Sequence, residues 1–413
     1  MAVIRPFKAL RPRKDLALKV ASRPYDVLNS DEARAEAKNN PYSFLHVTKS
    51  EIDLPEDVDV HSNAVYEKAK ENLEKLLFEG ILFQDQYPFY YIYRLIMPAI
   101  TPGGSSHSQT GLVCVSAVAD YFKNVIKKHE LTRPDKEQDR INHIKTTRAQ
   151  TGNVFLAYND VKELNDLIEH WKKNQPASYE FTAEDGIQHS IWIVNHPAVI
   201  ASITALFAAK VPCTYIADGH HRAASAAKVH QELPENKNAQ YFITTIFPAS
   251  QLTILDYNRV VKDLNGLSTS QFLQKIEKDF ILEKTETAYS PERLHRFGMY
   301  LEGQWYILTA KEGTYTTDPI GVLDVSILSN NILDKILAIK DQRIDKRVDF
   351  AGGIRGLKEL EHRVNSGEMK VAFSLHPVTI KQLFTIADSG NIMPPKSTWF
   401  EPKLRDGLLT HLI

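Results

Sequence analysis

Residues Cys213 to Leu233 read CTYIADGHHRAASAAKVHQEL, and this stretch combines a strand pattern with a helix pattern. The short apolar run from Cys213 to Ala217 is typical of a strand. The small residues after Arg222 are typical of a slim helix that packs closely on a sheet. Between the two lie an acid, a glycine, two histidines and an arginine. The pattern therefore predicts a strand, a tight turn and a helix, with polar side chains gathered where the helix begins.

The start of this helix is expected to bind an anion. Backbone N–H groups in a first helical turn have no partner within the helix, and the helix dipole adds positive potential there. Gly219 allows a positive φ angle or the close approach of a ligand. Arg222 can donate two hydrogen bonds to a phosphate or carboxylate, and His220 and His221 add donors that respond to pH near neutrality. We therefore expect Gly219, His220, His221 and Arg222 to bind phosphate groups.

Asp218 does not fit a simple phosphate site, because a carboxylate repels an anion. It fits if it binds Mg²⁺, accepts a proton from an acceptor hydroxyl, or orients a histidine. A structural alternative stays open, in which Asp218 caps the helix, Arg222 pairs with it, and the histidines lie at the surface.

Length and composition indicate an ordinary globular protein. The 413 residues suffice for two or three domains, and 43% hydrophobic with 24% charged residues is a typical balance. The 50 basic and 51 acidic residues give a net charge of -1, which argues against a surface devoted to nucleic acid. The two cysteines lie in apolar runs, as expected for buried thiols in a reducing compartment. With no secretory or membrane-spanning pattern, we expect a cytoplasmic protein without a membrane partner.

Strand-like and helix-like segments alternate along the chain, which predicts a mixed α/β fold. Residues 30–40 (SDEARAEAKNN) are expected to form a helix with Ser30 as N-cap, and residues 43–47 (SFLHV) a strand. A long amphipathic helix should end at Gly80. Two strands, FYYIYRLIM and TGLVCVSAV, flank the turn-rich TPGGSSHSQ, and Asp185-Gly186 predicts a hairpin. A similar series of elements follows Pro248, so we place a boundary near residue 250, with domains at 1–250 and 251–413.

Three further motifs carry candidate site residues. SRPYDVLN (22–29) forms a Pro-Tyr-Asp turn in which Asp26 is suited to position an acceptor or act as base; the alternative is a helix-entry turn. KKHELTRPDKEQDR (127–140) predicts a helix start that puts Glu137 and Arg140 on one face; the alternative is a solvated charged face. MPPKSTWFEPKLRDG (393–407) either closes over a phosphate with Lys396, Ser397, Thr398, Lys403 and Arg405 or is a rigid loop.

The segment ADGHHRAASA resembles the signature of a large family of uncharacterised bacterial and archaeal proteins about as long as this one. The resemblance extends nearly end to end through IRPFKALRP, PYDVLN, NPYSFLHV, KKHELTRPDKEQDR, DYNRVVKDLNG, GGIRGLKELE and MPPKSTWFEPKLRDG. The D-G-x-H-R box is in turn similar to that of free-serine kinases of the ParB/sulfiredoxin superfamily, where a turn at a helix start holds nucleotide phosphates.

The resemblance implies a ParB/sulfiredoxin-like nucleotide-binding core with large insertions in residues 1–250, and a C-terminal α/β domain that closes the cleft. The implied reaction transfers a phosphoryl group from ADP or ATP to L-serine and gives O-phospho-L-serine. The known serine kinases use a glutamate as base, which has no secure equivalent here. Glu130 is the preferred base, ahead of Asp26 and Glu137. The roles that follow are Mg²⁺ at Asp218, catalysis at Glu130, Asp26, Asp218 and His220, and substrate binding at Tyr25, Asp26, His129, Glu137 and Arg140.

Two other functions compete with the kinase. One is a nucleotide-responsive, ParB-like regulatory protein that phosphorylates no metabolite, although no helix-turn-helix with a basic recognition helix is evident. The other is a phosphate-linked hydrolase. Zinc hydrolysis at His129-Glu130 and His220-His221 is less favoured, because no H-x-x-x-H or H-E-x-x-H spacing surrounds these residues.

Overall fold

The computed structural model describes residues 1–99 and 105–413, which divide into two compact units. Unit 1 comprises residues 1–128, 132–252 and 402–413, and unit 2 comprises residues 129–131 and 253–401. Both units combine helices with β-sheet, so the expected mixed α/β class is confirmed. The chain leaves unit 1 after Leu252. It returns at Pro402, so the last twelve residues do not belong with the second half of the chain.

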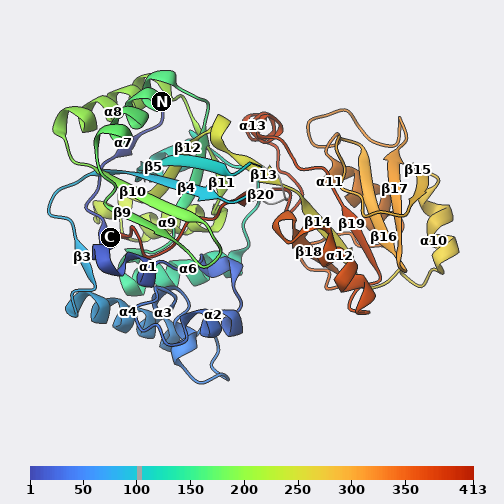
Figure 1. Ribbon diagram of the computed structural model, residues 1–413, viewed down its shortest axis with the longest axis horizontal. Helices are drawn as coiled ribbons and strands as arrows, with labels where there is room; N and C mark the ends of the chain where they lie inside the picture. Colours follow the sequence, from blue (N-terminus) through green and yellow to red (C-terminus); the bar gives the residue numbers. More distant parts are fainter. Residues whose placement is uncertain (100–104) are drawn as a thin grey trace. The chain divides into compact units, whose positions relative to one another are not determined.

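Unit 1 is built on a mixed sheet that the described residues form from nine strands (Figure 1). The strand order is β6-β11-β8-β12-β5-β4-β10-β9, and β1 also pairs with β5. The pairs β6–β11 and β8–β12 are parallel, and the other pairs are antiparallel. The strands are β1 (Ile4–Arg5), β4 (Tyr90–Met97), β5 (His107–Ala117), β6 (Ile126–Lys127), β8 (Val154–Tyr158), β9 (Tyr179–Thr182), β10 (Gln188–Val194), β11 (Thr214–Asp218) and β12 (Tyr241–Pro248).

Two short antiparallel pairs complete the strands of this unit. They are β2 (Leu10–Pro12) with β3 (Leu82–Gln84), and β7 (Ala149–Gln150) with β21 (His411–Leu412). Isolated bridges also join Leu10 to Thr410 and Ser22 to Asp406. The C-terminal tail is therefore held in unit 1 by backbone hydrogen bonds to the first residues of the chain.

In Figure 1, helices α2, α3 and α4 lie together at the lower end of unit 1. Helix α6 contacts both α4 and α9. The helices of this unit are α1 (Ala17–Val20), α2 (Ser30–Ala37), α3 (Leu45–Thr48), α4 (Asn63–Phe78), α5 (Val118–Phe122), α6 (Pro134–Thr147), α7 (Lys162–Asn174), α8 (Pro197–Lys210) and α9 (His220–Glu232). Its 3₁₀ turns are η1 (Lys14–Leu16), η2 (Tyr25–Val27), η3 (Ser50–Asp53), η4 (Asn238–Gln240) and η5 (Ala249–Gln251).

Small side chains let α9 lie close to the sheet, as the sequence predicts. Ala223 and Ala226 of this helix are buried in one apolar cluster with Val154 and Leu156 of β8. A larger residue at either alanine would push the helix away from the strands. The spacing of small residues therefore fixes how near the start of α9 comes to β8.

Unit 2 contains a six-stranded antiparallel sheet in the order β15-β17-β16-β19-β14-β18, and a separate pair, β13 with β20. The strands are β13 (Thr253–Leu255), β14 (Tyr257–Val261), β15 (Phe280–Thr285), β16 (Arg296–Leu301), β17 (Gln304–Ala310), β18 (Val348–Gly352), β19 (Val371–Ser374) and β20 (Trp399–Glu401). The helices are α10 (Thr269–Ile276), α11 (Asp324–Leu328), the π-helix η6 (Ser329–Asp334), the 3₁₀ turn η7 (Gly353–Arg355), α12 (Gly356–Asn365) and α13 (Ile380–Asp388).

Several local predictions are confirmed. The long helix α4 is followed by Gly80 with φ +67°, and Gly186 of the β9–β10 hairpin has φ +80°. Strands β4 and β5 pair antiparallel, while residues 100–104 of the turn-rich segment between them lie outside the described residues. No helix among the described residues is both long and apolar enough to cross a membrane.

Two local predictions are wrong. Residues 43–47 contain the start of helix α3 instead of a strand, because a short apolar run has no periodicity that separates a buried strand from a buried helical turn. The N-cap of α2 is Asn29 and not Ser30. The Asn29 side chain accepts a hydrogen bond from the Glu32 N–H, and the Glu32 carboxylate accepts one from the Asn29 N–H. This reciprocal capping box places the helix start one residue earlier.

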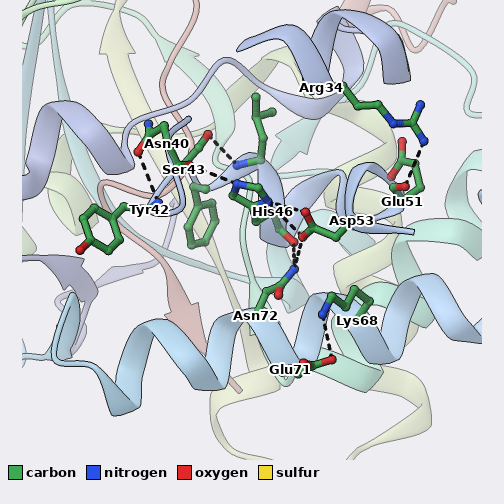
Figure 2. Close-up of polar contacts among 12 residues, drawn as sticks. Arg34, Asn40, Tyr42, Ser43, His46, Glu51, Asp53, Lys68, Glu71 and Asn72 are labelled. Carbon is green, nitrogen blue, oxygen red and sulfur yellow. Dashed lines mark hydrogen bonds and ion pairs between the residues drawn. The ribbon is translucent and has the colours of Figure 1, made fainter. Parts of the chain in front are cut away.

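A charged hydrogen-bond network joins α3, η3 and α4 (Figure 2). His46 Nδ1 lies 2.8 and 3.0 Å from the carboxylate oxygens of Asp53, and His46 Nε2 lies 3.1 Å from the Asn40 carbonyl oxygen. Both ring nitrogens face acceptors, so this geometry requires the doubly protonated imidazolium. Asn72 donates hydrogen bonds of 2.7 Å to the His46 carbonyl and to Asp53.

The network shifts two pKa values in opposite directions. The hydrogen bond to Asp53 raises the pKa of His46 above 6.5. Burial alone would raise the pKa of Asp53, but hydrogen bonds from His46 and Asn72 hold it below 3.8. The His46 contribution to stability is therefore complete below pH 6.5 and is lost as pH rises through the raised pKa. The Asp53 contribution is complete above pH 3.8 and is lost as pH falls through the lowered pKa.

Replacing His46 by glutamine should therefore remove a pH-dependent part of the stability. We expect the free energy of unfolding of His46→Gln to fall by about 1 kcal/mol relative to the native protein in mildly acidic buffer, and by less in alkaline buffer. Urea unfolding at the two pH values measures this, with the exposed His196→Gln as control. Equal pH dependence in the native protein and His46→Gln would rule out the charged pair.

Candidate functional site

The D-G-H-H-R segment forms the predicted strand, turn and helix. Strand β11 ends at Asp218, and α9 begins at His220. Gly219 is the N-cap, with φ +95° and ψ 32°, a conformation that side chains with a Cβ rarely adopt. No side chain caps the helix, and its first turn contains no acidic residue. The start of α9 therefore keeps the positive potential that favours an anion.

Arg222 is the central side chain of this junction and is only 8% exposed. One guanidinium nitrogen, Nη1, donates to the Asn153 carbonyl, and Nη2 lies 3.4 Å from an oxygen of Asp26 and 3.4 Å from an oxygen of Asp218. Burial alone would lower the pKa of Arg222, but the two carboxylates raise it above its usual value. The guanidinium is therefore charged at all physiological pH values and joins the η2 turn to the end of β11.

Two glycines make room for this buried arginine. A Cβ on Gly219 would lie 3.0 Å from Arg222 Nε and 3.2 Å from its Cζ, and a Cβ on Gly152 would lie 3.1 Å from its Cδ. Arg222 Nε is itself buried and has no hydrogen-bond partner among the described residues. The N–H at Nε therefore lacks an acceptor next to Gly219, and an anion oxygen would supply one.

Tyr25, Arg140 and Arg222 converge on a small cavity in unit 1. The cavity measures about 20 Å³ and is also lined by Thr151 and Gly152. Its volume is that of a single water. The Arg140 guanidinium lies 4.0 Å from the centre of the Tyr25 ring. The sequence-predicted substrate residues Tyr25 and Arg140 are thus neighbours of the predicted phosphate residue Arg222.

Arg140 is held by the residue before it in the chain. Asp139 accepts a hydrogen bond of 2.8 Å from Arg140 Nε and also receives hydrogen bonds from Tyr66 and His61. Burial lowers the Arg140 pKa, whereas Tyr25 and Asp139 more than offset this and leave the pKa raised. Arg140 is therefore a fixed positive charge at the cavity.

Two residues of the C-terminal tail belong to this site. Lys403, which the sequence places in the candidate phosphate-closing segment, has its Nζ 3.1 Å from the Asp218 carboxylate. Asp406 was not singled out from the sequence. It is 1% exposed, and burial raises its pKa to about 7 despite the nearby charge of Arg222.

The two histidines differ in their surroundings. His220 is buried. His221 Nε2 accepts a hydrogen bond of 2.9 Å from the backbone N–H of Arg133, the N-cap of α6. Because Nε2 accepts, this nitrogen carries no proton in the structure. His221 therefore supports the start of α6, and only its other ring nitrogen can serve as a donor.

Glu137 lies in a structural ion pair. Its carboxylate accepts a hydrogen bond from Thr132 and pairs with Lys228 of α9. Burial would raise the pKa of Glu137, but Lys228 and Thr132 together lower it. A carboxylate kept ionised by a lysine is a weak proton acceptor. Glu137 and Arg140 do share α6, but they contact different partners.

The other sequence-predicted residues belong to unit 2. Glu130 lies in the wall of a cavity of that unit, and the carbonyl of buried His129 accepts a hydrogen bond from Met393. Ser397 donates to the Pro394 carbonyl of its own loop, at 2.6 Å. Lys396 has φ +57°. The Ser397 hydrogen bond therefore lies within the loop itself. Nucleotide binding by Lys396, Ser397 and Thr398 stays a prediction.

The residues around Arg222 are compatible with the expected Mg²⁺. Asp26 and Asp218 both approach the same guanidinium nitrogen, and both carboxylates are partly exposed. Mg²⁺ is usually held by one or two protein carboxylates together with phosphate oxygens and waters. Lys403 competes for Asp218, so a metal at this carboxylate would have to displace its ammonium group.

The close packing of Arg222 against Gly219 predicts that a methyl group at Gly219 lowers the unfolding free energy more than one at an unobstructed glycine. Gly219→Ala and Gly80→Ala both place alanine at a positive φ, but no atom lies within 4 Å of a Cβ at Gly80. We expect Gly80→Ala to lose about 1 kcal/mol of unfolding free energy from backbone strain alone. Gly219→Ala should lose at least twice as much, since Arg222 must also move. Equal losses in urea unfolding would show that Arg222 yields freely.

The chain matches one described protein family and has distant similarity to several solved structures. A family model described as "Protein of unknown function (DUF1015)" matches residues 4–326. No curated protein matches the chain. Among solved structures, a free serine kinase in complex with AMP is 11% identical, with 70% of this chain and 86% of that chain covered and a TM-score of 0.37.

Two other solved structures are similar to the same degree. A conserved hypothetical protein from Pyrococcus furiosus is 12% identical over 72% of this chain and 94% of that chain, with a TM-score of 0.36. SbnI with a C-terminal truncation, from Staphylococcus aureus, is 11% identical over 70% of this chain and 82% of that chain, also with a TM-score of 0.36. Because the family model covers most of the sequence, the chain belongs to the family of proteins described as DUF1015.

Proposed function

We propose that unit 1 binds the phosphates of a nucleotide at the start of α9 and that the protein is a small-molecule kinase, with L-serine as acceptor. The observation that carries the proposal is the buried Arg222 Nε next to Gly219, which has no hydrogen-bond acceptor among the described residues. The choice of serine as acceptor and of ADP or ATP as donor follows the sequence resemblance.

The charges at the site suit a phosphate better than a neutral ligand. Arg222 is buried, Arg140 is largely buried, and both are charged, while α9 adds the positive end of its dipole. Asp26 and Asp218 offset part of this charge in the absence of a ligand. A phosphate that bonds to Arg222 would weaken its long 3.4 Å contacts and release both carboxylates for other roles.

Those roles match what phosphoryl transfer requires. The acceptor hydroxyl oxygen forms a bond to the transferred phosphorus, the bond from that phosphorus to the nucleotide oxygen breaks, and the hydroxyl proton passes to a base. Asp26 is exposed on the η2 turn and is suited to accept this proton. Asp218 would hold Mg²⁺, which neutralises phosphate charge when bound. Glu130 of unit 2 stays the other candidate for the base.

The nucleotide site is tested by changing the shape of the Arg222 cation and keeping its charge. Arg222→Lys preserves the counter-ion of the two carboxylates but removes the Nε–H and the planar fork. We expect ADP and ATP to bind about tenfold more weakly, measured by calorimetry with Mg²⁺. The exposed Arg13→Ala is the control, and urea unfolding establishes that Arg222→Lys is folded under the conditions of the binding measurement. Unchanged affinity would place the nucleotide elsewhere.

The acceptor and the base are tested in one assay. Purified protein with Mg²⁺, L-serine and either ADP or ATP should form O-phospho-L-serine, detected by mass spectrometry. Asp26→Asn and Glu130→Gln each remove one candidate base; the variant that lacks the true base should lose at least about 100-fold in rate and still bind nucleotide. Nucleotide binding without phosphoserine formation by the native protein would favour the regulatory alternative.

A further inference from the structure

Unit 2 contains a buried arginine that no carboxylate neutralises. Arg259 of β14 is 1% exposed and makes no ion pair with any described residue. Its guanidinium donates to the carbonyls of Tyr257 and Pro395 and, at 3.4 Å, to the side-chain oxygen of Gln342. The ring of Phe350 lies 5.0 Å from its Cζ. These are neutral partners, so a full positive charge stays inside the unit.

The same neutral partners form part of a cavity wall. Gln342 and Pro395 both line a cavity of about 330 Å³ in unit 2. Gln342 is nearly buried, and its amide nitrogen donates to Ser329 Oγ at 2.7 Å, another residue of the wall. One amide thus connects Arg259 to the cavity lining. Because field lines from a buried charge are weakly screened, Arg259 gives this wall a positive potential.

The surface charges of the cavity add to that potential on one side. Lys340 is exposed on the wall and has no hydrogen bond or ion pair with the described residues. Arg343 is paired with Asp341 through hydrogen bonds of 2.9 and 2.7 Å, so these two charges largely cancel. Glu130 is the remaining acid of the lining and disfavours an anion at its own position. An anionic group is therefore favoured at Lys340.

Another part of the lining is apolar and exposed. Leu131 is 58% exposed and Ile392 is 37% exposed, and both line the cavity with Met393 and Pro394. Ser329 begins the π-helix η6, an element that is rare and often found at functional sites. A cavity of this volume, with one apolar wall and a few polar groups, has the character of a small-molecule site.

We propose that unit 2 binds a small organic anion in this cavity, with its phosphate or carboxylate group at Lys340 and its carbon skeleton against Leu131 and Ile392. Arg259 acts from behind the wall, through its charge and through the orientation of Gln342. Burial lowers the pKa of Arg259 to about 9, so it is still protonated at neutral pH. The lining includes Glu130, the other candidate base of the proposed kinase reaction, but anion binding at Lys340 does not require the Arg222 site of unit 1.

Ligand-observed NMR on the full chain tests the site with four probes. Glycerol 3-phosphate and butanoate carry the two candidate anionic groups, and glycerol and butan-1-ol are their neutral counterparts. We expect at least one anion to bind at millimolar concentration and neither neutral probe to do so. The stronger anion distinguishes a phosphate site from a carboxylate site.

Three variants show where the anion binds. Lys340→Gln should weaken binding about fivefold, while Lys358→Gln, which removes an exposed lysine from α12, should leave it unchanged. Binding should also survive Arg222→Lys, which alters the site of unit 1. The proposal fails if neither anion binds, if Lys340→Gln binds as the native protein does, or if Arg222→Lys abolishes binding. Since Lys340 is exposed, its replacement leaves the fold intact and each of these results is interpretable.

Discussion

The arrangement of unit 1 depends on one buried cation, the guanidinium of Arg222. It joins the η2 turn through Asp26, the end of β11 through Asp218 and the segment before β8 through Asn153. Removing one partner of a buried charged group commonly costs about 3–5 kcal/mol, because the other partner is left uncompensated. Gly152 and Gly219 are therefore needed for packing as much as for backbone conformation, since a Cβ at either position would press on this side chain.

The two units treat a buried arginine in different ways. Arg222 has carboxylates beside it and a raised pKa, whereas Arg259 has carbonyls, an amide and aromatic rings, and a lowered pKa. Arg222 is neutralised by carboxylates without a ligand, so a phosphate that binds to it has to replace its contacts with Asp26 and Asp218. A charge without acids keeps its field, which reaches a nearby cavity wall. The first arrangement suits a site in which binding and carboxylate release are coupled, and the second suits simple anion binding.

Sequence reasoning succeeded where chemistry is local. The junction at Gly219 was predictable because a strand pattern, a glycine and a helix pattern occur in one short stretch, and each is fixed by near neighbours. It failed at residues 43–47, where a short apolar run fits a strand and a helical turn equally well. It also missed Asp406, because the backbone bridges from Ser22 to Asp406 and from Leu10 to Thr410, which join the tail to the first residues of the chain, have no local sequence pattern.

The sequence by itself determined the mixed α/β class, the helix start at the D-G-H-H-R turn, and the residue types able to hold a phosphate. Tertiary structure alone decided which of those residues meet. It placed Tyr25, Arg140 and Arg222 around one cavity. It also paired Glu137 with Lys228 and put Glu130 in the wall of a cavity of unit 2. The reason is physical: hydrogen bonds within a turn depend on a few adjacent residues, but charge pairing depends on which distant segments the packed sheet brings within contact distance.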